Sequence, residues 1–139
     1  MNFDALLDRA TNGPFWLRKP ELADIVAEAI HYRDVKTYDL LAFTIMPNHV
    51  HLVIALARND ISLHKILQSL KRHTARQCNR SLGRTGPFWQ HESYDHIVRD
   101  ENELERILHY VIENPVKAGL CKKWNEWRWT YIKEGLIDI

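Results

Sequence analysis

The sequence has few cysteines, no long apolar run and almost no net charge, and each of these absences excludes a class of protein. Its two cysteines, Cys78 and Cys121, are far apart, so neither a disulfide scaffold nor a cysteine-rich zinc site is predicted. No stretch approaches the roughly 18 apolar residues that a membrane helix needs. Asp4 and Asp8 interrupt the N-terminal stretch, which therefore does not resemble a signal peptide. We expect a cytoplasmic protein that has no membrane partner.

What is present is the composition of a globular domain, and we expect a single domain over residues 1–139. Hydrophobic residues make up 45% and charged residues 27%, with a formal net charge of +1. A chain of this length can bury a substantial core. The near-neutral total hides an asymmetry: residues 62–84 hold six basic residues and no Asp or Glu.

This basic stretch predicts a surface that binds a polyanion. Exposed helices ordinarily mix both signs of charge, and an unmixed basic row can neutralise phosphates without reading sequence. A simple solvated helix face is the alternative interpretation. The candidate DNA-binding residues are Lys65, Lys71, Arg72, Arg76, Arg80 and Arg84.

Apolar spacing predicts three helices. They begin near Pro20, Ser62 and Asp100, where apolar residues recur at i, i+3, i+4 and i+7. Glu103 follows Asp100 as in a capping box. Asn114-Pro115 is expected to interrupt the third helix, because a residue before proline avoids the helical region.

Three segments are expected to be strands: 38–45, 49–56 and the less regular 88–98. Helices separated by hairpin-type strands favour an α+β fold, with the helices on one face of a mainly antiparallel sheet. Three strands make a thin sheet. The tryptophan-rich tail after residue 123 is not assigned to an element.

The stretch MPNHVHLVI, residues 46–54, places two histidines on one side of a predicted strand. Because side chains alternate, His49 and His51 share a face with Val53, while the intervening apolar residues face the core. The two imidazoles can converge on one cation or one phosphate, although polar residues on a solvated strand would show the same pattern. A metal site would need further ligands. A histidine-triad hydrolase would need a third histidine where Val53 stands.

Tyr110 and Asn114 lie four residues apart, on the same side of the third predicted helix. Asn114 offers an amide oxygen to a cation, and Tyr110 offers a phenol as nucleophile. A phenol with a pKa near 10 attacks poorly unless its proton is removed or a cation lies close. A boundary tyrosine and a helix-ending asparagine are the plain alternatives. Spacing leaves four other tyrosines as rivals: Tyr32, Tyr38, Tyr94 and Tyr131.

The histidine stretch, the later stretch GPFWQHESYDHIVRDENELERILHYVIENPVKAGL and their order resemble the REP-associated tyrosine transposases, relatives of the small HUH transposases. The resemblance covers residues 14–129. It implies a ferredoxin-like fold and a DNA nickase and strand transferase that acts on single-stranded or hairpin DNA.

The resemblance also implies roles for individual residues. His49 and His51 match two metal ligands, with Mg²⁺ or Mn²⁺ as the ion. Tyr110 matches the nucleophile that forms a 5′-phosphotyrosine link. Asn114 matches a position that supplies a further metal ligand in related enzymes. A monomer or a homodimer is expected.

One departure from the family pattern concerns the N-terminus. Family members usually begin with a strand of the FVTFR kind, whereas MNFDALLDRATNGPFWL contains no β-like run. We therefore expect a sheet that lacks this first strand. An inactive remnant or a domesticated regulator that binds hairpin DNA without cutting it is the alternative function, and a bland globular domain is the third.

Overall fold

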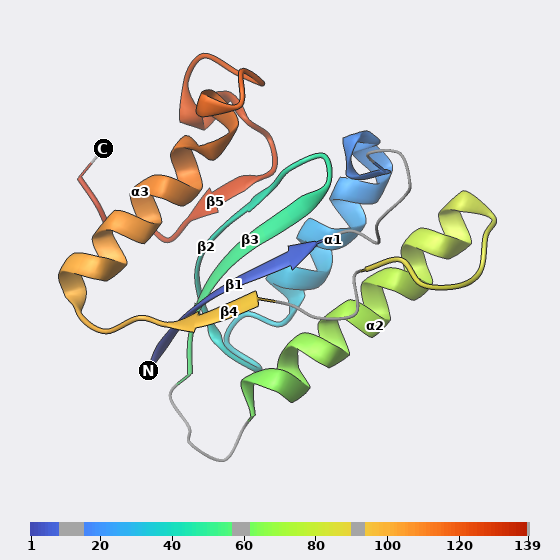
Figure 1. The fold of residues 1–139 in the computed structure, drawn as a ribbon, viewed down its shortest axis with the longest axis horizontal. Helices are drawn as coiled ribbons and strands as arrows, with labels where there is room; N and C mark the ends of the chain where they lie inside the picture. Colours follow the sequence, from blue (N-terminus) through green and yellow to red (C-terminus); the bar gives the residue numbers. More distant parts are fainter. Residues whose placement is uncertain (9–15, 57–61, 90–93, 139) are drawn as a thin grey trace.

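The computed structural model describes residues 1–8, 16–56, 62–89 and 94–138, and it contains one five-stranded antiparallel sheet. The strands lie side by side in the order β4-β1-β3-β2-β5 (Figure 1). Their bounds are β1 Asn2–Asp8, β2 Asp39–Ile45, β3 His49–Ala55, β4 Tyr94–Ile97 and β5 Thr130–Ile132.

Five helical segments lie between these strands in the described residues. α1 lies between β1 and β2, and α2 lies between β3 and β4, which with the order β4-β1-β3-β2 gives the ferredoxin-like arrangement. This confirms the predicted fold class. The helical bounds are η1 Trp16–Arg18, α1 Pro20–Tyr32, α2 Leu63–Leu82, α3 Glu101–Lys117 and η2 Trp124–Glu126.

The N-terminal segment forms a strand, so the expectation that it contains none is wrong. β1 pairs with β3 on one side and with β4 on the other, which places it inside the sheet. Phe3, Ala5 and Leu7 alternate toward the core. Asp4 lies between them on the opposite face, and this carboxylate makes the segment look unlike a strand in sequence.

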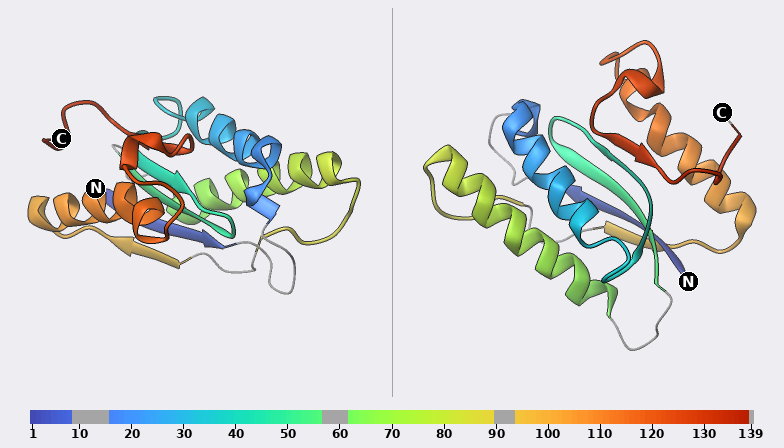
Figure 2. Two further views of the ribbon diagram at one scale, coloured as in Figure 1. Left: turned by 90° about the horizontal axis from the view of Figure 1, so that it is seen from above. Right: turned by 180° about the vertical axis from the view of Figure 1, so that it is seen from behind.

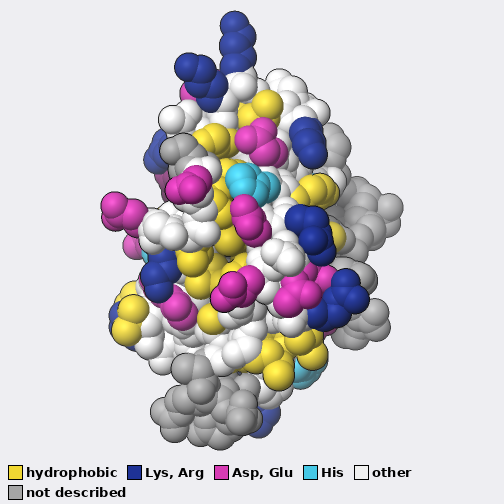
Figure 3. All heavy atoms as spheres, turned by 90° about the vertical axis from the view of Figure 1, so that its left-hand side faces the viewer, with side chains coloured by type: hydrophobic (Ala, Val, Ile, Leu, Met, Phe, Trp, Pro, Cys, Tyr) yellow, Lys and Arg dark blue, Asp and Glu magenta, His cyan; other side chains and the backbone are white. Residues whose placement is uncertain are grey.

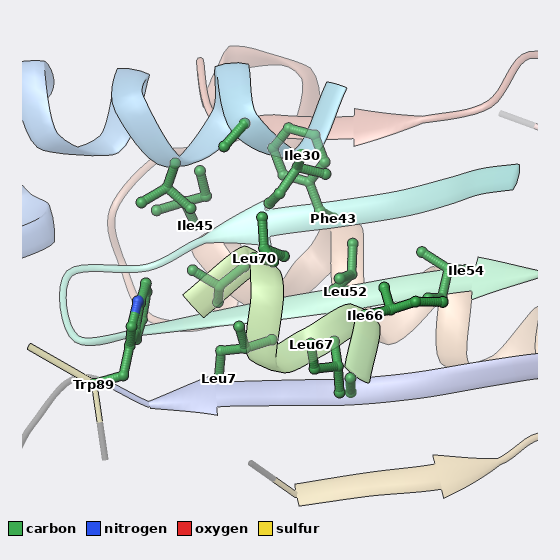
Figure 4. Close-up of a cluster of buried hydrophobic side chains, with 14 of the residues drawn as sticks. Leu7, Ile30, Phe43, Ile45, Leu52, Ile54, Ile66, Leu67, Leu70 and Trp89 are labelled. Carbon is green, nitrogen blue, oxygen red and sulfur yellow. The ribbon is translucent and has the colours of Figure 1, made fainter. Parts of the chain in front are cut away.

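α1 and α2 cover one face of the sheet and enclose the larger core (Figures 2 and 4). Leu52 and Ile54 of β3 point toward Leu70 and Ile66 of α2 in this layer. Their alternation with the histidines is as the strand pattern predicts. At about 25 cal/mol per Å² of apolar area removed from water, this face supplies much of the stabilising free energy.

α3 lies on the opposite face, so the expectation that all helices share one face is wrong. Leu108 and Val111 of α3 pack against Ala42 and Val53, whose side chains point away from the larger core. The interruption expected at Pro115 is also wrong, since α3 continues to Lys117. Pro115 lies in the last turn of α3 and is buried. It removes one backbone hydrogen bond near the helix end, where the helix does not continue far beyond it.

The third predicted strand and the tail differ from expectation. Only residues 94–97 of the expected 88–98 form a strand, while 90–93 lie outside the described residues. In the unassigned tail, β5 pairs with β2 through Thr130, whose hydroxyl lies 2.8 Å from that of Thr44. None of the helices in the described ranges is long and apolar enough to cross a membrane.

Candidate functional site

The histidine strand presents its two imidazoles to the face that α3 covers. Val50 and Leu52 enter the larger core, while Val53 contacts the α3 layer, so His49 and His51 lie on the α3 side of β3. His51 is buried, with 8% of its surface exposed, whereas His49 is half-buried nearer the turn. The predicted orientation of both histidines is therefore what the structure contains.

Tyr110 contacts His51. The two rings meet edge to face with their centroids 5.5 Å apart, a favourable geometry for aromatic pairs. Tyr110 remains 52% exposed, and the ammonium of Lys117 lies 5.8 Å from its ring centroid. The fold thus joins two residues that are 59 positions apart, with one ring buried and the other open to solvent.

α3 is fixed against the sheet by a buried carboxylate near its start. The Asp100 side chain accepts the backbone N–H of Glu103 at 2.8 Å, which confirms half of the predicted capping box. Glu103 accepts hydrogen bonds from the backbone and side chain of Arg99 and pairs with His96 Nε2 at 2.8 Å. These bonds, first that from the Arg99 backbone, lower the pKa of Glu103 from 4.5 to about 2. Because His96 belongs to β4, this cluster sets where Tyr110 lies, two turns further on.

The rival tyrosines lie elsewhere. Tyr38 is buried, its hydroxyl donates to the Ile30 carbonyl at 2.8 Å, and burial raises its pKa. Tyr131 packs edge to face on His31, on the α1 side. Tyr32 is exposed beside Lys36. The side chain of Tyr94 lies outside the described residues. Among the described tyrosine side chains, Tyr110 is the one that contacts a histidine of the pair.

Asp4 is a site residue that the sequence reasoning missed. Its Oδ1 forms a hydrogen bond with His51 Nε2, and the two side chains are 18% and 10% exposed. In the β1–β3 register, Asp4 faces Val53 and Leu6 faces His51, so the carboxylate reaches diagonally to the imidazole. The missed signal is a carboxylate in the middle of an otherwise alternating apolar segment.

The predicted metal ligands do not yet form a closed cluster. His49 Nδ1 lies 2.9 Å from the Asn48 side-chain oxygen. Asn114 is half-buried one turn after Tyr110. Across the part of the chain that the structure describes, no group of three His, Cys, Asp or Glu residues could hold an ion as the side chains stand. The donor types nevertheless suit a divalent cation, because two imidazoles and a carboxylate oxygen lie on one sheet face.

The predicted DNA-binding residues lie on the other layer of the molecule. Lys65, Arg72, Arg76 and Arg80 are exposed along α2, and Lys71 is half-buried. Arg84 is engaged in the structure: its guanidinium lies 4.4 Å from the Trp16 ring centroid and donates to Asn79 Oδ1 at 2.7 Å. α2 packs on the face opposite to α3, so the basic row and Tyr110 are separated by the sheet.

The exposed side of α3 has a different charge from α2. Figure 3, which views the molecule from the side on which α3 lies in Figure 1, shows Asp and Glu side chains spread among Lys and Arg. Along α3, a hollow of about 600 Å³ includes Tyr110. Its other lining residues include acidic and basic side chains: Asn102, Glu105, Arg106, His109, Glu113 and Lys117.

Fold and site together define a ferredoxin-like α+β domain with an H-x-H strand beside a tyrosine helix. The family model described as "Transposase IS200 like" matches residues 16–114. The chain therefore belongs to the IS200-like transposase family.

Two curated relatives carry the name REP-associated tyrosine transposase. The first relative is from Haemophilus influenzae and has this name provisionally. It is 29% identical over 99 residues, which cover 65% of this chain and 56% of that protein. One from Escherichia coli is 22% identical over 92 residues, which covers 66% and 53%. The chain thus spans about half the length of the curated relatives it matches.

Solved structures share the fold. A REP-associated tyrosine transposase bound to a REP hairpin superimposes with a TM-score of 0.72 at 19% identity, over 93% of this chain and 74% of that one. A candidate transposase of Deinococcus radiodurans gives a TM-score of 0.52 at 18% identity, over 82% and 89%. The family model and the named relatives, together with this shared fold, confirm the resemblance read from the motifs.

Proposed function

We propose that this domain nicks and rejoins single-stranded or hairpin DNA through Tyr110. The observation that carries the proposal is the contact of the exposed Tyr110 ring with the buried imidazole of His51. A nucleophile that acts on DNA must be accessible to a large substrate, and it must also be held in position by neighbouring groups. Here the nucleophile is exposed and the neighbouring group is buried. The family membership and the hairpin bound by a relative of the same fold support DNA as the substrate. A cytoplasmic location follows from such a substrate in a bacterial cell.

The chemistry is an exchange of phosphodiester bonds. The Tyr110 oxygen attacks the scissile phosphorus and loses its proton to water, while the bond from phosphorus to the 3′ oxygen breaks. The leaving 3′ oxygen takes up a proton, and the DNA remains joined to the protein as a 5′-phosphotyrosine. Attack by a 3′-hydroxyl on this link reverses the step and rejoins the strand. The bond energy is retained throughout.

His49, His51 and Asn114 are the residues that would hold Mg²⁺ or Mn²⁺. A bound divalent cation would polarise the scissile phosphate and offset its developing charge. In this proposal His51 has a second role, since its ring orients Tyr110 through the edge-to-face contact. The exposed basic residues of α2 bind phosphates of the hairpin.

The test is a nicking assay on a labelled, hairpin-bearing single strand with Mn²⁺ or Mg²⁺. A covalent protein–DNA adduct should form on denaturing gels, and it should disappear with a chelator and with Tyr110→Phe. Tyr32→Phe is the matched control, because Tyr32 is similarly exposed but does not line the α3 hollow. If Tyr110→Phe still forms the adduct, the nucleophile is assigned wrongly. Hairpin binding with no adduct in the unaltered chain would favour the regulator.

A further inference from the structure

The N-terminal strand β1 places the carboxylate of Asp4 beside His51. The two histidines alone would offer a cation no negative charge. Asp4 lies on the interior strand β1, which separates β3 from β4 in Figure 1. Its Oδ1 and the Nε2 of His51 are hydrogen-bonded to each other, so these two potential donor atoms lie side by side. Both side chains are largely shielded from solvent. A carboxylate oxygen thus lies directly beside His51, one of the two histidines.

Asp4 is an energetically unfavourable residue for this position in a strand. A carboxylate within a sheet is depleted relative to β-branched residues, and removing it from water costs free energy unless it is paired. The facing residue on β3 is Val53, which is fully buried, so an apolar side chain would pack here. A residue that weakens the strand without helping the core points to a chemical role.

We propose that Asp4 is a direct carboxylate ligand of the divalent cation, together with His51 and His49. This inference rests on the proposed function, because it assumes that the cation binds at the histidine pair. Mg²⁺ and Mn²⁺ prefer oxygen ligands, and an anionic oxygen compensates cation charge in a way that two neutral imidazoles do not. Asn114 would contribute only a neutral amide.

The proposal gives each member of the face a distinct task. His51 is the shared residue, since it contacts both Asp4 and Tyr110. His49 must turn its ring from Asn48 toward the other two ligands when the cation binds. Asp4 and Tyr110 lie on different elements, so the cation would connect β1, β3 and α3 through their side chains.

The first experiment measures Mn²⁺ affinity of the full chain by titration of the free-ion electron paramagnetic resonance signal. Asp4→Asn keeps the shape and an acceptor oxygen but removes the charge, and it should weaken Mn²⁺ binding by about 10-fold or more. Asp39→Asn is the matched control, because Asp39 is an exposed strand carboxylate paired with Lys133. It should bind Mn²⁺ as the unaltered chain does. Thermal melting checks that each variant is folded.

The second experiment separates ligation from mere orientation of His51. Asp4→Cys places a thiolate at the same position, and Co²⁺ should then give a sulfur-to-cobalt charge-transfer band. That band requires a direct bond between the residue and the metal. Neither the unaltered chain, with Cys78 and Cys121, nor Asp39→Cys should show it.

The outcomes distinguish this inference from the proposed function. Normal Mn²⁺ affinity in Asp4→Asn, or a cobalt spectrum of Asp4→Cys without the band, would overturn the ligand role while leaving nicking by Tyr110 intact. If the unaltered chain forms the DNA adduct but binds no Mn²⁺, the metal site itself is refuted, and Asp4 with it. Tenfold weaker binding together with the band would establish Asp4 as a ligand.

Discussion

The two faces of the sheet are built from the same strands but differ in what each residue does. On the α1/α2 face, Leu52 and its neighbours are apolar and their partners are apolar, so shape and volume decide their fit. On the α3 face, His51 has two specific partners, Asp4 and Tyr110. Successive residues of β3 therefore have different roles. Those on one side pack in the core, and those on the other side make specific polar and aromatic contacts. Substitutions on the two faces should separate stability from function.

The largest loss of stability is expected from Leu52→Ala. Leu52 is fully buried, and truncation of such a side chain costs about 2–5 kcal/mol through lost burial and the cavity left behind. His51→Ala, one residue earlier on the same strand, should cost less stability but abolish the DNA adduct. Urea unfolding measures the first effect and the nicking assay the second. Equal losses of stability would contradict the division between the faces.

A smaller loss is expected from Thr74→Val, which alters a polar contact inside the α2 layer. The Thr74 hydroxyl accepts the Trp89 indole N–H and donates to the Leu70 carbonyl, both at 2.8 Å. Valine keeps the shape but leaves the buried indole N–H unpaired, at a cost of about 1–3 kcal/mol. In a Trp89→Phe background the same change should cost much less. A full cost in that background would show that the hydrogen bond is not the cause.

The α3 face should respond to acid through Glu103. Its pKa is lowered to about 2, so the charged form stabilises the fold above pH 4.5, and this contribution is lost as the pH falls from 4.5 toward 2. Glu103→Gln should lower the melting temperature at neutral pH, and the difference from the unaltered chain should shrink over that range. Glu105→Gln is the control, because Glu105 is exposed two residues further on. A difference that is constant with pH would refute the role of the charge.

The smallest effect on stability, and a clear one on binding, is expected from the double change Arg72→Ala and Arg76→Ala. Both residues are exposed on α2, so melting should be unchanged. If each neutralises one phosphate, the slope of log affinity against log salt should fall by about 2 in total. The pair Lys122→Ala and Lys123→Ala, also exposed, should leave the slope unchanged. An unaltered slope in the arginine variant would show that the DNA does not bind to this side of α2.

The sequence predicts much of this fold because three helices and the β2–β3 hairpin carry strong periodicity. α1, α2 and α3 begin at or next to the predicted residues Pro20, Ser62 and Asp100. Which face a helix covers is not encoded in its own period. The layer of α3 follows from Ala42 and Val53, two small apolar residues that read in sequence as ordinary core. β5 spans only three residues, too few for a recognisable pattern.

The site was predictable where residues form a motif and not where they only meet in space. His51 and Tyr110 follow from the spacing within their own elements, and the structure brings them into contact. Asp4 lies in a segment that lacks a strand signal because Asp4 itself interrupts it. Sequence rules of this kind fail most often where a residue serves chemistry at the expense of local preference.

The position of β1 inside the sheet has a consequence for how the protein folds during synthesis. β1 precedes its partners β3 and β4 in the chain, so it stays unpaired until residues far along the chain have been made. An unpaired apolar strand can associate with copies of itself, and a charge within it opposes that association. We therefore expect the charge of Asp4 to oppose aggregation of the segment NFDALLD during synthesis.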